Sequence, residues 1–326
     1  MATGIVSIAA KLENMPEVAW TLFITNAVFY VVLWLLTLLR IFRNFSRVIA
    51  DLTSHERGHG FFTMVAGTSV LGRQFHVIAE LPEVAAILWL VSLVLWCGLM
   101  YTFITAVTVR ETKPSLENGL SGGWLLLVVS TQSISVTGAS ITDHFGAWAE
   151  AILFLTLSMF LLGFLLYILV ICLIFYRFTF FKFKPEELTP PYWINMGAMA
   201  ITTLAGSVLI LEANHWQIIV DIMPFLKGVT LLFWATATWW IPLLLILGVW
   251  RHGYKRFPIT YDPSYWGLVF PLGMYTVCTF QLAKALGLDF LFLIPRYFIY
   301  LAIIAWLAAF VGLVVQATRK LILRSP

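Results

Sequence analysis

Charged residues are scarce in this chain: they make up 11% of its 326 residues, while hydrophobic residues make up 61% and the mean hydropathy is +0.92. A soluble domain is typically about half apolar and about a quarter charged. A water-soluble fold could not cover so apolar a surface with polar groups. The composition therefore excludes an ordinary soluble domain and predicts an integral membrane protein, with membrane lipid as its surroundings.

Cysteine and basic runs are also sparse. The chain has three cysteines, Cys97, Cys172 and Cys278, and each lies in an apolar stretch, which argues against a disulfide framework. The net charge is only +4, and no run of about five to eight basic residues suggests nucleic-acid binding. No separate cleavable signal peptide is visible, because the opening residues 1–10 are followed by further apolar runs.

Apolar runs long enough to cross a membrane dominate the chain. A spanning helix needs about 20 mostly apolar residues. Ten candidates lie near residues 1–10, 18–40, 61–79, 82–109, 122–140, 146–176, 193–212, 216–250, 265–286 and 293–318. The first supplies only about half a span, so either this helix is short or the natural start codon lies upstream.

The basic residues are distributed unequally between the two sides that these spans define. One side carries fifteen: Arg40, Arg43, Arg47, Arg57, Arg110, Lys113, Arg177, Lys182, Lys184, Arg251, Lys255, Arg256, Arg319, Lys320 and Arg324. The other side and its helix ends carry five: Lys11, Arg73, Lys227, Lys284 and Arg296. Basic loops stay in the cytoplasm. We therefore predict a multi-pass protein of the cell membrane with both termini cytoplasmic.

The spans alternate in character with a near-constant period. Odd spans are rich in small and hydroxyl residues, and even spans are longer and more apolar. Equivalent positions in the odd spans are separated by 64, 64, 71 and 74 residues, as marked by Thr3, Gly67, Thr131, Thr202 and Thr276. This period predicts one domain, 1–326, built of five helical hairpins near 1–40, 61–109, 122–176, 193–250 and 265–318.

Polar groups are costly against lipid but acceptable in a wet lumen. The alternation therefore predicts an all-α membrane protein in which five polar helices line a central pore, inside a ring of five apolar helices. In the alternative interpretation, the small residues only permit close packing of the helices. The polar side chain of Gln132 and the many hydroxyls favour the pore.

Several stretches of the chain resemble the tellurite-resistance/dicarboxylate transporter family, which includes guard-cell slow anion channels and fungal malate and sulfite transporters. The resemblance covers essentially the whole chain. It is carried by residues 1–7, 60–72, Asn118-Gly119-Leu120 with Gly123-Trp124, Ser130-Thr131-Gln132-Ser133, Asn195-Met196-Gly197-Ala198 and Phe270-Pro271-Leu272-Gly273-Met274. His59 stands where such proteins often have proline.

The resemblance implies ten helices as five hairpins in a quasi-fivefold arrangement around a pore, usually in a homotrimer. It also implies a pore blocked by a phenylalanine on the ninth helix, which here is Phe270. Pro271 next to it can kink the helix and direct the ring into the lumen. We predict a channel-like transporter of small anions, such as chloride, nitrate, sulfite or a C4-dicarboxylate like malate.

Anion passage needs weak, distributed stabilisation. The predicted pore lining is Thr3, Gly4, Gly67, Thr68, Thr131, Gln132, Thr202, Gly206, Gly273 and Thr276. Cations at the mouths would raise the local anion concentration. The candidate cations are Arg73, Lys284 and Arg296. In the alternative interpretation, these side chains extend to the membrane interface or pair with Glu80, Glu83 or Asp289.

Other interpretations remain open. A proton-coupled dicarboxylate, tellurite or sulfite carrier would need titratable groups in the lumen, and the odd spans offer little besides His76. His55-Glu56-Arg57-Gly58-His59 matches the H-E-x-x-H zinc pattern, but it lies in a loop without an evident third ligand, so an intramembrane metalloenzyme is a remote alternative. A non-conducting scaffold is disfavoured by the five polar helices. We predict neither an enzyme nor a cofactor.

Overall fold

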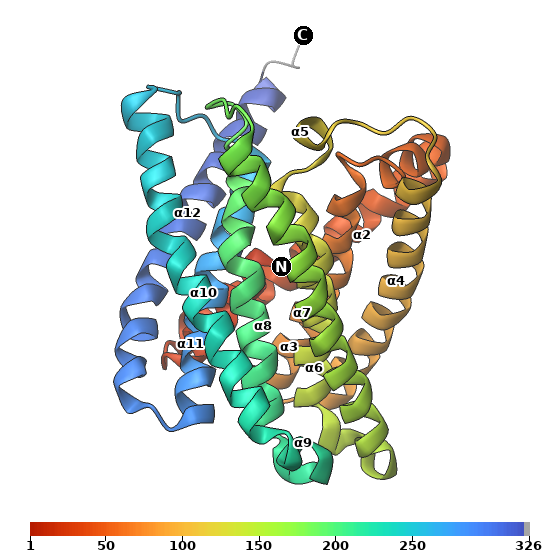
Figure 1. Cartoon of the computed structure of the whole chain (residues 1–326), viewed down its shortest axis with the longest axis vertical. Coiled ribbons are helices and arrows are strands. Elements are labelled where there is room, and N and C mark those ends of the chain that lie inside the picture. The colour runs from red at the N-terminus through yellow and green to blue at the C-terminus, as the bar shows by residue number, and fades with distance from the viewer. Residues whose placement is uncertain (323–326) are drawn as a thin grey trace.

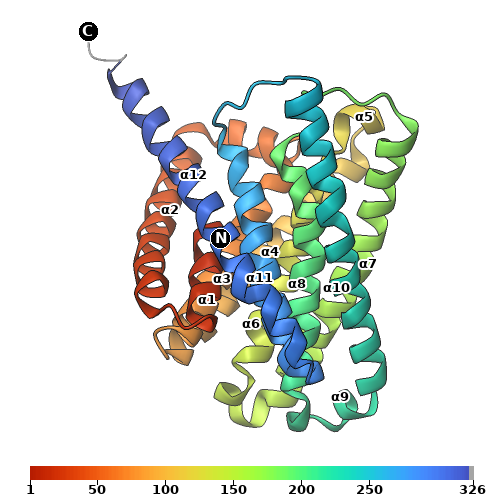
Figure 2. The same cartoon turned by 90° about the vertical axis from the view of Figure 1, so that its left-hand side faces the viewer.

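The computed structural model describes residues 1–322, in which every regular element is a helix and no strand is present. Figures 1 and 2 show long helices running roughly along the long axis of the molecule. The prediction of an all-helical protein is confirmed. Arg324, one of the residues counted on the basic side, lies outside the described residues.

Five long helices form the outside of the molecule. Their apolar side chains are extensively exposed, so that only 17–39% of the most apolar stretch of each is buried. Several begin with proline in the first turn, where the missing N–H costs no hydrogen bond. These outer helices are α2 Pro16–Leu52, α4 Pro82–Val109, α7 Ala149–Phe180, α10 Met223–Val249 and α12 Leu293–Ile322.

A second set of helices lies inside, and nearly all of their side chains are buried. These ring helices are α1 Ala2–Leu12, α3 Phe62–Val77, α6 Leu126–Ser140, α8 Ile194–Leu211 and α11 Trp266–Leu286. Each packs against the outer helix that follows it in the chain. In addition, α1 contacts α3, α3 contacts α6, α6 contacts α8, α8 contacts α11 and α11 contacts α1, which closes the ring.

A repeated local structure leads into the ring helices. A 3-10 turn directly precedes α3, α6, α8 and α11, at Gly58–Phe61, Gly122–Leu125, Pro190–Trp193 and Pro263–Tyr265. Each of these turns contacts the next one along the chain. Glycine is required where they meet: a Cβ at Gly122 would lie 2.6 Å from the carbonyl oxygen of Pro191.

Hydrogen bonds also join each hairpin to the next. On α2, α4 and α10 an aromatic side chain meets a threonine on the following ring helix, and Trp306 of α12 returns to α1. The pairs are Tyr30–Thr68 (2.9 Å), Trp96–Thr131 (2.8 Å), Trp234–Thr279 (3.0 Å) and Trp306–Thr3 (3.0 Å). The hairpin of α7 is joined differently, since Trp240 of α10 donates to the Tyr167 hydroxyl of α7 at 3.1 Å. Buried indole N–H groups need an acceptor, and these hydroxyls provide it.

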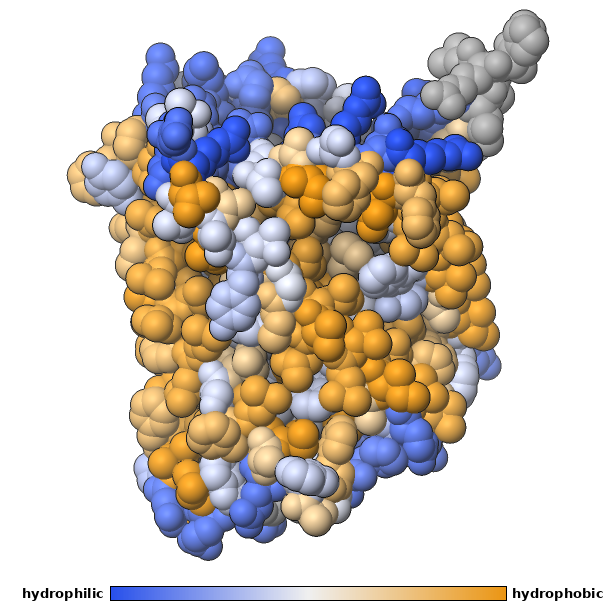
Figure 3. All heavy atoms as spheres, turned by 90° about the vertical axis from the view of Figure 1, so that its right-hand side faces the viewer, coloured by the Kyte–Doolittle hydropathy of each residue, from blue (hydrophilic) through white to orange (hydrophobic). Residues whose placement is uncertain are grey.

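The surface fits a bilayer. Seven helices among the described residues are long and apolar enough to cross a membrane. Figure 3 shows a broad apolar belt between two hydrophilic ends. We call the end that carries the carboxyl ends of α2, α4, α7, α10 and α12 the basic end, because the predicted basic side maps to it (top of Figure 1).

Two predicted spans differ from the helices observed. The run predicted over 18–40 continues as α2 to Leu52, with a non-helical kink at Asn44, because the polar residues after Arg40 extend the helix beyond the apolar belt. The run predicted over 216–250 is broken: α9 Gln217–Asp221 ends first, and α10 starts afresh at Met223 with Pro224 in its first turn.

Candidate functional site

A small cavity lies inside the ring, and every ring helix contributes to its lining. The lining residues are Ile5, Ile8, Ser69, Val70, Arg73, Ser133, Val136, Thr137, Ile201, Leu204 and Met274. The cavity volume is about 20 Å³, which is room for about one water molecule. In this structure the ring is therefore too tightly packed to hold a hydrated ion.

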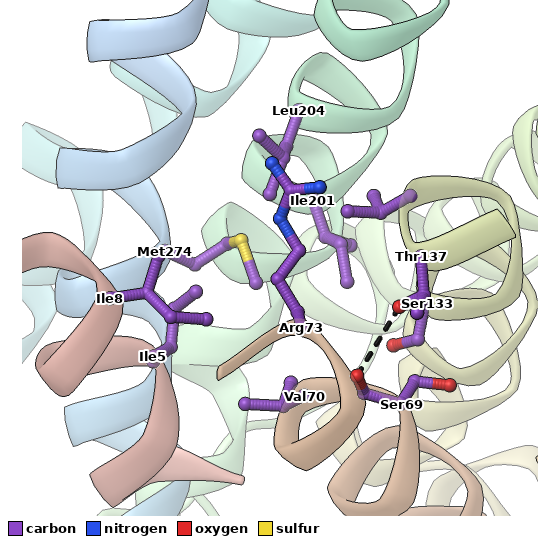
Figure 4. A pocket seen from close by; sticks show the side chains of 11 residues that line it. Ile5, Ile8, Ser69, Val70, Arg73, Ser133, Thr137, Ile201, Leu204 and Met274 are labelled. Atoms are coloured by element: carbon purple, nitrogen blue, oxygen red, sulfur yellow. Dashed lines mark hydrogen bonds between the residues drawn. The ribbon is translucent and has the colours of Figure 1, made fainter. Parts of the chain in front are cut away.

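Arg73 is the only charged side chain in this lining. It comes from α3, is 8% exposed, and points into the cavity between Ile5, Ile8 and Met274 on one side and Ser133 and Thr137 on the other (Figure 4). Its Nε and Nη1 atoms are buried without a hydrogen-bond partner. A buried cation with unused donors is costly unless an anion or water accepts from it.

Hydroxyl groups supply the remaining polarity of the cavity. Thr137 donates to the carbonyl oxygen of Ser69 at 3.2 Å, so α6 and α3 are joined at this level (Figure 4). Ser133 donates to the carbonyl oxygen of Val129 within its own helix. The Ser69 hydroxyl is buried without a partner. Together with Arg73, these groups offer weak polar stabilisation against otherwise apolar walls.

Ionisable residues lie near Arg73 on the side away from the basic end. The carboxylate of Glu212, directly after α8, interacts electrostatically with Arg73. His76, one turn after Arg73 on α3, interacts with Arg73 and with Asp143. A carboxylate and an imidazole therefore lie near Arg73, on the side away from the basic end.

Phe270 is fully buried on α11, with 0% exposure. It precedes Met274 by four residues, so the two side chains share a helix face and Phe270 lies one turn nearer the basic end. Pro271 packs close to Gly197 of α8, where a Cβ would meet its ring at 2.7 Å. This contact fixes α11 closely against α8 beside Phe270.

Several residues predicted to line a pore use their polar groups in hydrogen bonds to other helices or to their own helix backbone. The hydroxyls of Thr3, Thr68 and Thr131 bond to aromatic residues of outer helices, as described above. Gln132 donates to the carbonyl oxygen of Phe160 on α7 at 3.0 Å. The Thr202 and Thr276 hydroxyls donate to carbonyl oxygens one turn back in their own helices, those of Ala198 and Leu272.

The predicted glycines lie at helix contacts, except Gly67. A Cβ on Gly4 would meet Val70 of α3 at 2.6 Å, and one on Gly273 would meet Ile5 of α1 at 2.9 Å. A Cβ on Gly206 would overlap the Thr230 hydroxyl of α10. At Gly67 the nearest such atom is 4.0 Å away. Close helix approach thus explains Gly4, Gly206 and Gly273 in this structure.

Gly206→Ala is expected to destabilise the protein by about 1–3 kcal/mol, because the added methyl overlaps Thr230 in a closely packed contact. The matched control is Gly228→Ala on α10, where a Cβ would meet nothing within 4 Å. The measurement is thermal unfolding of the purified protein in one detergent. Equal stability of the two variants, with altered anion flux only in Gly206→Ala, would contradict a packing role for Gly206.

The other two predicted cations lie on the surface. Lys284 is exposed in the last turn of α11, with its Nζ 5.0 Å from the ring centre of Phe280. Arg296 is exposed on α12 near Glu13. Burial raises the pKa of Glu13, and the Arg296 charge opposes that rise. Of the three cations, only Arg73 reaches the cavity.

The residues of the zinc-like pattern are held by packing contacts. The His59 ring lies against Gly123, and its Nε2 is 3.4 Å from the Ser121 hydroxyl. Burial lowers the pKa of His59 to about 4, so it is neutral at pH 7. His55 packs near the Trp124 ring at 6.2 Å. The described residues include no group of three His, Cys, Asp or Glu side chains that could hold a metal ion.

The cavity lining includes residues that sequence reasoning did not select. Ser69 and Ser133 follow the predicted Thr68 and Gln132 by one residue, and Met274 follows Gly273. One residue along a helix turns the side chain by about 100°. The hydroxyl-rich runs indicate the helix segments that border the cavity, but a single sequence does not show which face of each helix points inward.

The fold and the cavity define a class of protein: a multi-pass helical membrane protein with a cation-bearing cavity enclosed by its inner helices. A family model described as "Voltage-dependent anion channel" (SLAC1) matches residues 1–314. The chain therefore belongs to this family of membrane anion transporters, and the predicted resemblance is confirmed.

Individual relatives agree with this assignment. The chain is 36% identical over 148 residues to an uncharacterized membrane protein, Rv1735c, of Mycobacterium tuberculosis, covering 45% of this chain and 75% of that protein. It is 24% identical over 296 residues to an uncharacterized transporter, MJ0762, of Methanocaldococcus jannaschii, covering 89% of this chain and 84% of that protein.

Proposed function

We propose that this protein is a channel-like transporter that carries small anions through the centre of the ring, with Arg73 as the attracting cation and Phe270 as the gate. The observation that carries the proposal is the buried Arg73, whose Nε and Nη1 lack partners inside a cavity that all the ring helices line. A positive charge in a poorly solvated space favours anions strongly.

The pore would be formed by five hairpins in quasi-fivefold order, with ten helices in the membrane, of which the 11-residue α1 covers only about half the thickness. The closed ring contacts and the repeated 3-10 turns support this arrangement. The outer helices expose apolar side chains that would face lipid or other copies in a homotrimer. The excess of basic residues would place the basic end, and with it the carboxyl end of α12, on the cytoplasmic side. The N-terminus lies midway between the two ends in this structure, because α1 has only 11 residues (Figures 1 and 2).

On this proposal, the present structure is the closed state of the transporter. A cavity of about 20 Å³ admits one water, so an anion would need the ring to widen at Phe270 and Met274. A rotamer change of Phe270 would provide that widening, since an aromatic ring across a narrow lumen excludes both water and ions. Chloride, nitrate, sulfite and a C4-dicarboxylate all carry the charge that Arg73 would attract.

A proton-coupled carrier of dicarboxylate, sulfite or tellurite is the second candidate. It is favoured by one observation: Glu212 and His76 both interact electrostatically with Arg73. Such a group could exchange a proton when an anion binds. In that case transport would depend on the pH gradient and not only on the potential.

Anion flux into proteoliposomes tests the proposal and separates the two candidates. Purified protein would be given chloride, nitrate or malate under an imposed potential, with and without a pH gradient. Potential-driven flux that needs no pH gradient supports the channel. Uptake that requires the pH gradient supports the carrier, and absence of any protein-dependent anion flux contradicts both.

A further inference from the structure

A second and larger cavity lies at the basic end, between α10, α11 and the turn Pro190–Trp193. Its volume is about 230 Å³, more than ten times that of the ring cavity. Arg251 and His252 line its polar part, and Leu244, Gly248 and Leu268 line its apolar part. We call it the basic-end pocket. It takes no part in the proposed anion path.

The backbone directs Arg251 and His252 into this pocket. Both belong to a π-helical turn, Trp250–Tyr254, which extends α10. Such turns are rare and frequently occur at functional sites. His252 Nδ1 donates to the carbonyl oxygen of Phe257 at 2.8 Å, and the Arg251 guanidinium lies 4.4 Å from the ring centre of Phe257. The turn and the following segment are thus fixed together.

Arg251 keeps unused hydrogen-bonding capacity in the pocket. Its Nε is buried and has no partner. The acidic residue of the following loop, Asp262, accepts from the Ser264 N–H at 2.8 Å and caps the next turn. Lys255 and Arg256 are exposed just beyond the π turn. Of the two acidic residues that precede the lining residue Leu188, Glu187 is paired with Arg177 at 3.3 Å and Glu186 is exposed. The polar part of the pocket is therefore suited to an anionic group.

The apolar part of the pocket adjoins the lipid-facing side of α10, because Gly248, which lines it, is only half-buried. Next to Leu244 and Gly248 on α10, the side chains of Leu245, Ile246 and Val249 are 54%, 64% and 69% exposed. A ligand that satisfies both parts has an anionic head and a hydrocarbon tail, and it reaches the pocket from the bilayer. Basic pockets between membrane helices at the cytoplasmic side suit anionic lipid headgroups.

We propose that the basic-end pocket binds one anionic phospholipid, whose phosphate contacts Arg251 and whose acyl chain lies along Leu244, Gly248 and Leu268. The inference rests on the membrane location and on the pocket. It does not depend on anion transport, so it can fail or succeed independently of the proposed function.

The test is native mass spectrometry of the full chain extracted from phosphatidylcholine vesicles with or without phosphatidylglycerol. The wild type is expected to retain one phosphatidylglycerol per chain. Arg251→Gln should lower its retention about tenfold, as expected for loss of a charge-assisted hydrogen bond. The matched control Lys255→Gln removes the same charge nearby and should change retention by less than about twofold.

A second pair of variants tests whether the acyl chain occupies the apolar part of the pocket, without any change of charge. Gly248→Leu fills the apolar part, and Gly228→Leu places the same side chain on the same helix away from the pocket; a Cβ meets nothing within 4 Å at either position. Retention should fall only in Gly248→Leu, while both proteins unfold at the wild-type temperature in phosphatidylcholine.

Three results would overturn the proposal. Equal losses in Arg251→Gln and Lys255→Gln would show general attraction to the surface. Unchanged retention in Gly248→Leu would show that the acyl chain does not enter. Displacement of the lipid by inorganic phosphate alone would show that the pocket binds a soluble anion.

Discussion

Phe270→Ala is expected to raise the anion current in proteoliposomes about tenfold or more, since removing about 1.4 kcal/mol from a barrier gives a factor of ten. Phe270 is fully buried and lies one turn from Met274, on the same face of α11 that borders the ring cavity. Truncation to alanine removes the aromatic ring that we propose as the block in the lumen. The measurement is current under an imposed potential at matched protein density.

The control for this prediction is Phe233→Ala. Phe233 is also buried, at 2% exposure, but it lies on the outer helix α10 and packs against Phe160 and Phe164 of α7. It should lose stability without gaining current. A similar rise in both variants would indicate leakage from loosened packing, and no rise in Phe270→Ala would place the gate elsewhere.

Arg73→Gln, introduced into the Phe270→Ala protein, is expected to reduce the anion current about tenfold or more. A unit charge acting at about 4 Å with an effective dielectric constant of about 20 contributes about 4 kcal/mol, so losing only part of this attraction has a large effect on ion occupancy. Glutamine keeps polarity and most of the volume. Arg73→Lys keeps the charge and should retain more current than Arg73→Gln.

Arg296→Gln is the matched control, because Arg296 is exposed on α12 and lies near Glu13. Its current should stay within about twofold of the parent, since exposed charges are screened. If Arg296→Gln and Arg73→Gln lower the current equally, the effect is general surface attraction. If Arg73→Gln leaves the current unchanged, anions do not pass the ring cavity.

The sequence predicts the helices well where apolar runs have clear ends. The run predicted over 82–109 coincides with α4 Pro82–Val109, because Pro82 starts the helix and Arg110 follows its last apolar residue. Where the apolar signal and the helix end at different places, the prediction is wrong: α2 continues to Leu52 through polar residues that leave the apolar belt.

The candidate site is harder to predict than the fold. Arg73 is identified from the sequence because a charge inside a polar span is rare and conspicuous. The same reasoning does not show which hydroxyl side chains face the cavity. Each ring helix is buried on all sides, so it has no polar stripe that indicates its orientation. Thr131 bonds to Trp96, 35 residues away, and only the tertiary structure shows that its partner lies there.

The most direct test of the central claim is whether a side chain in the ring cavity is reached by anions. Ser133→Cys would be made in Phe270→Ala protein whose Cys97, Cys172 and Cys278 are replaced, and its current followed during treatment with a small anionic thiol reagent. Ser133 lines the cavity with Arg73. We expect modification to lower the current, and excess chloride to slow the reaction. An unchanged current with the thiol fully modified would contradict a pore through the ring.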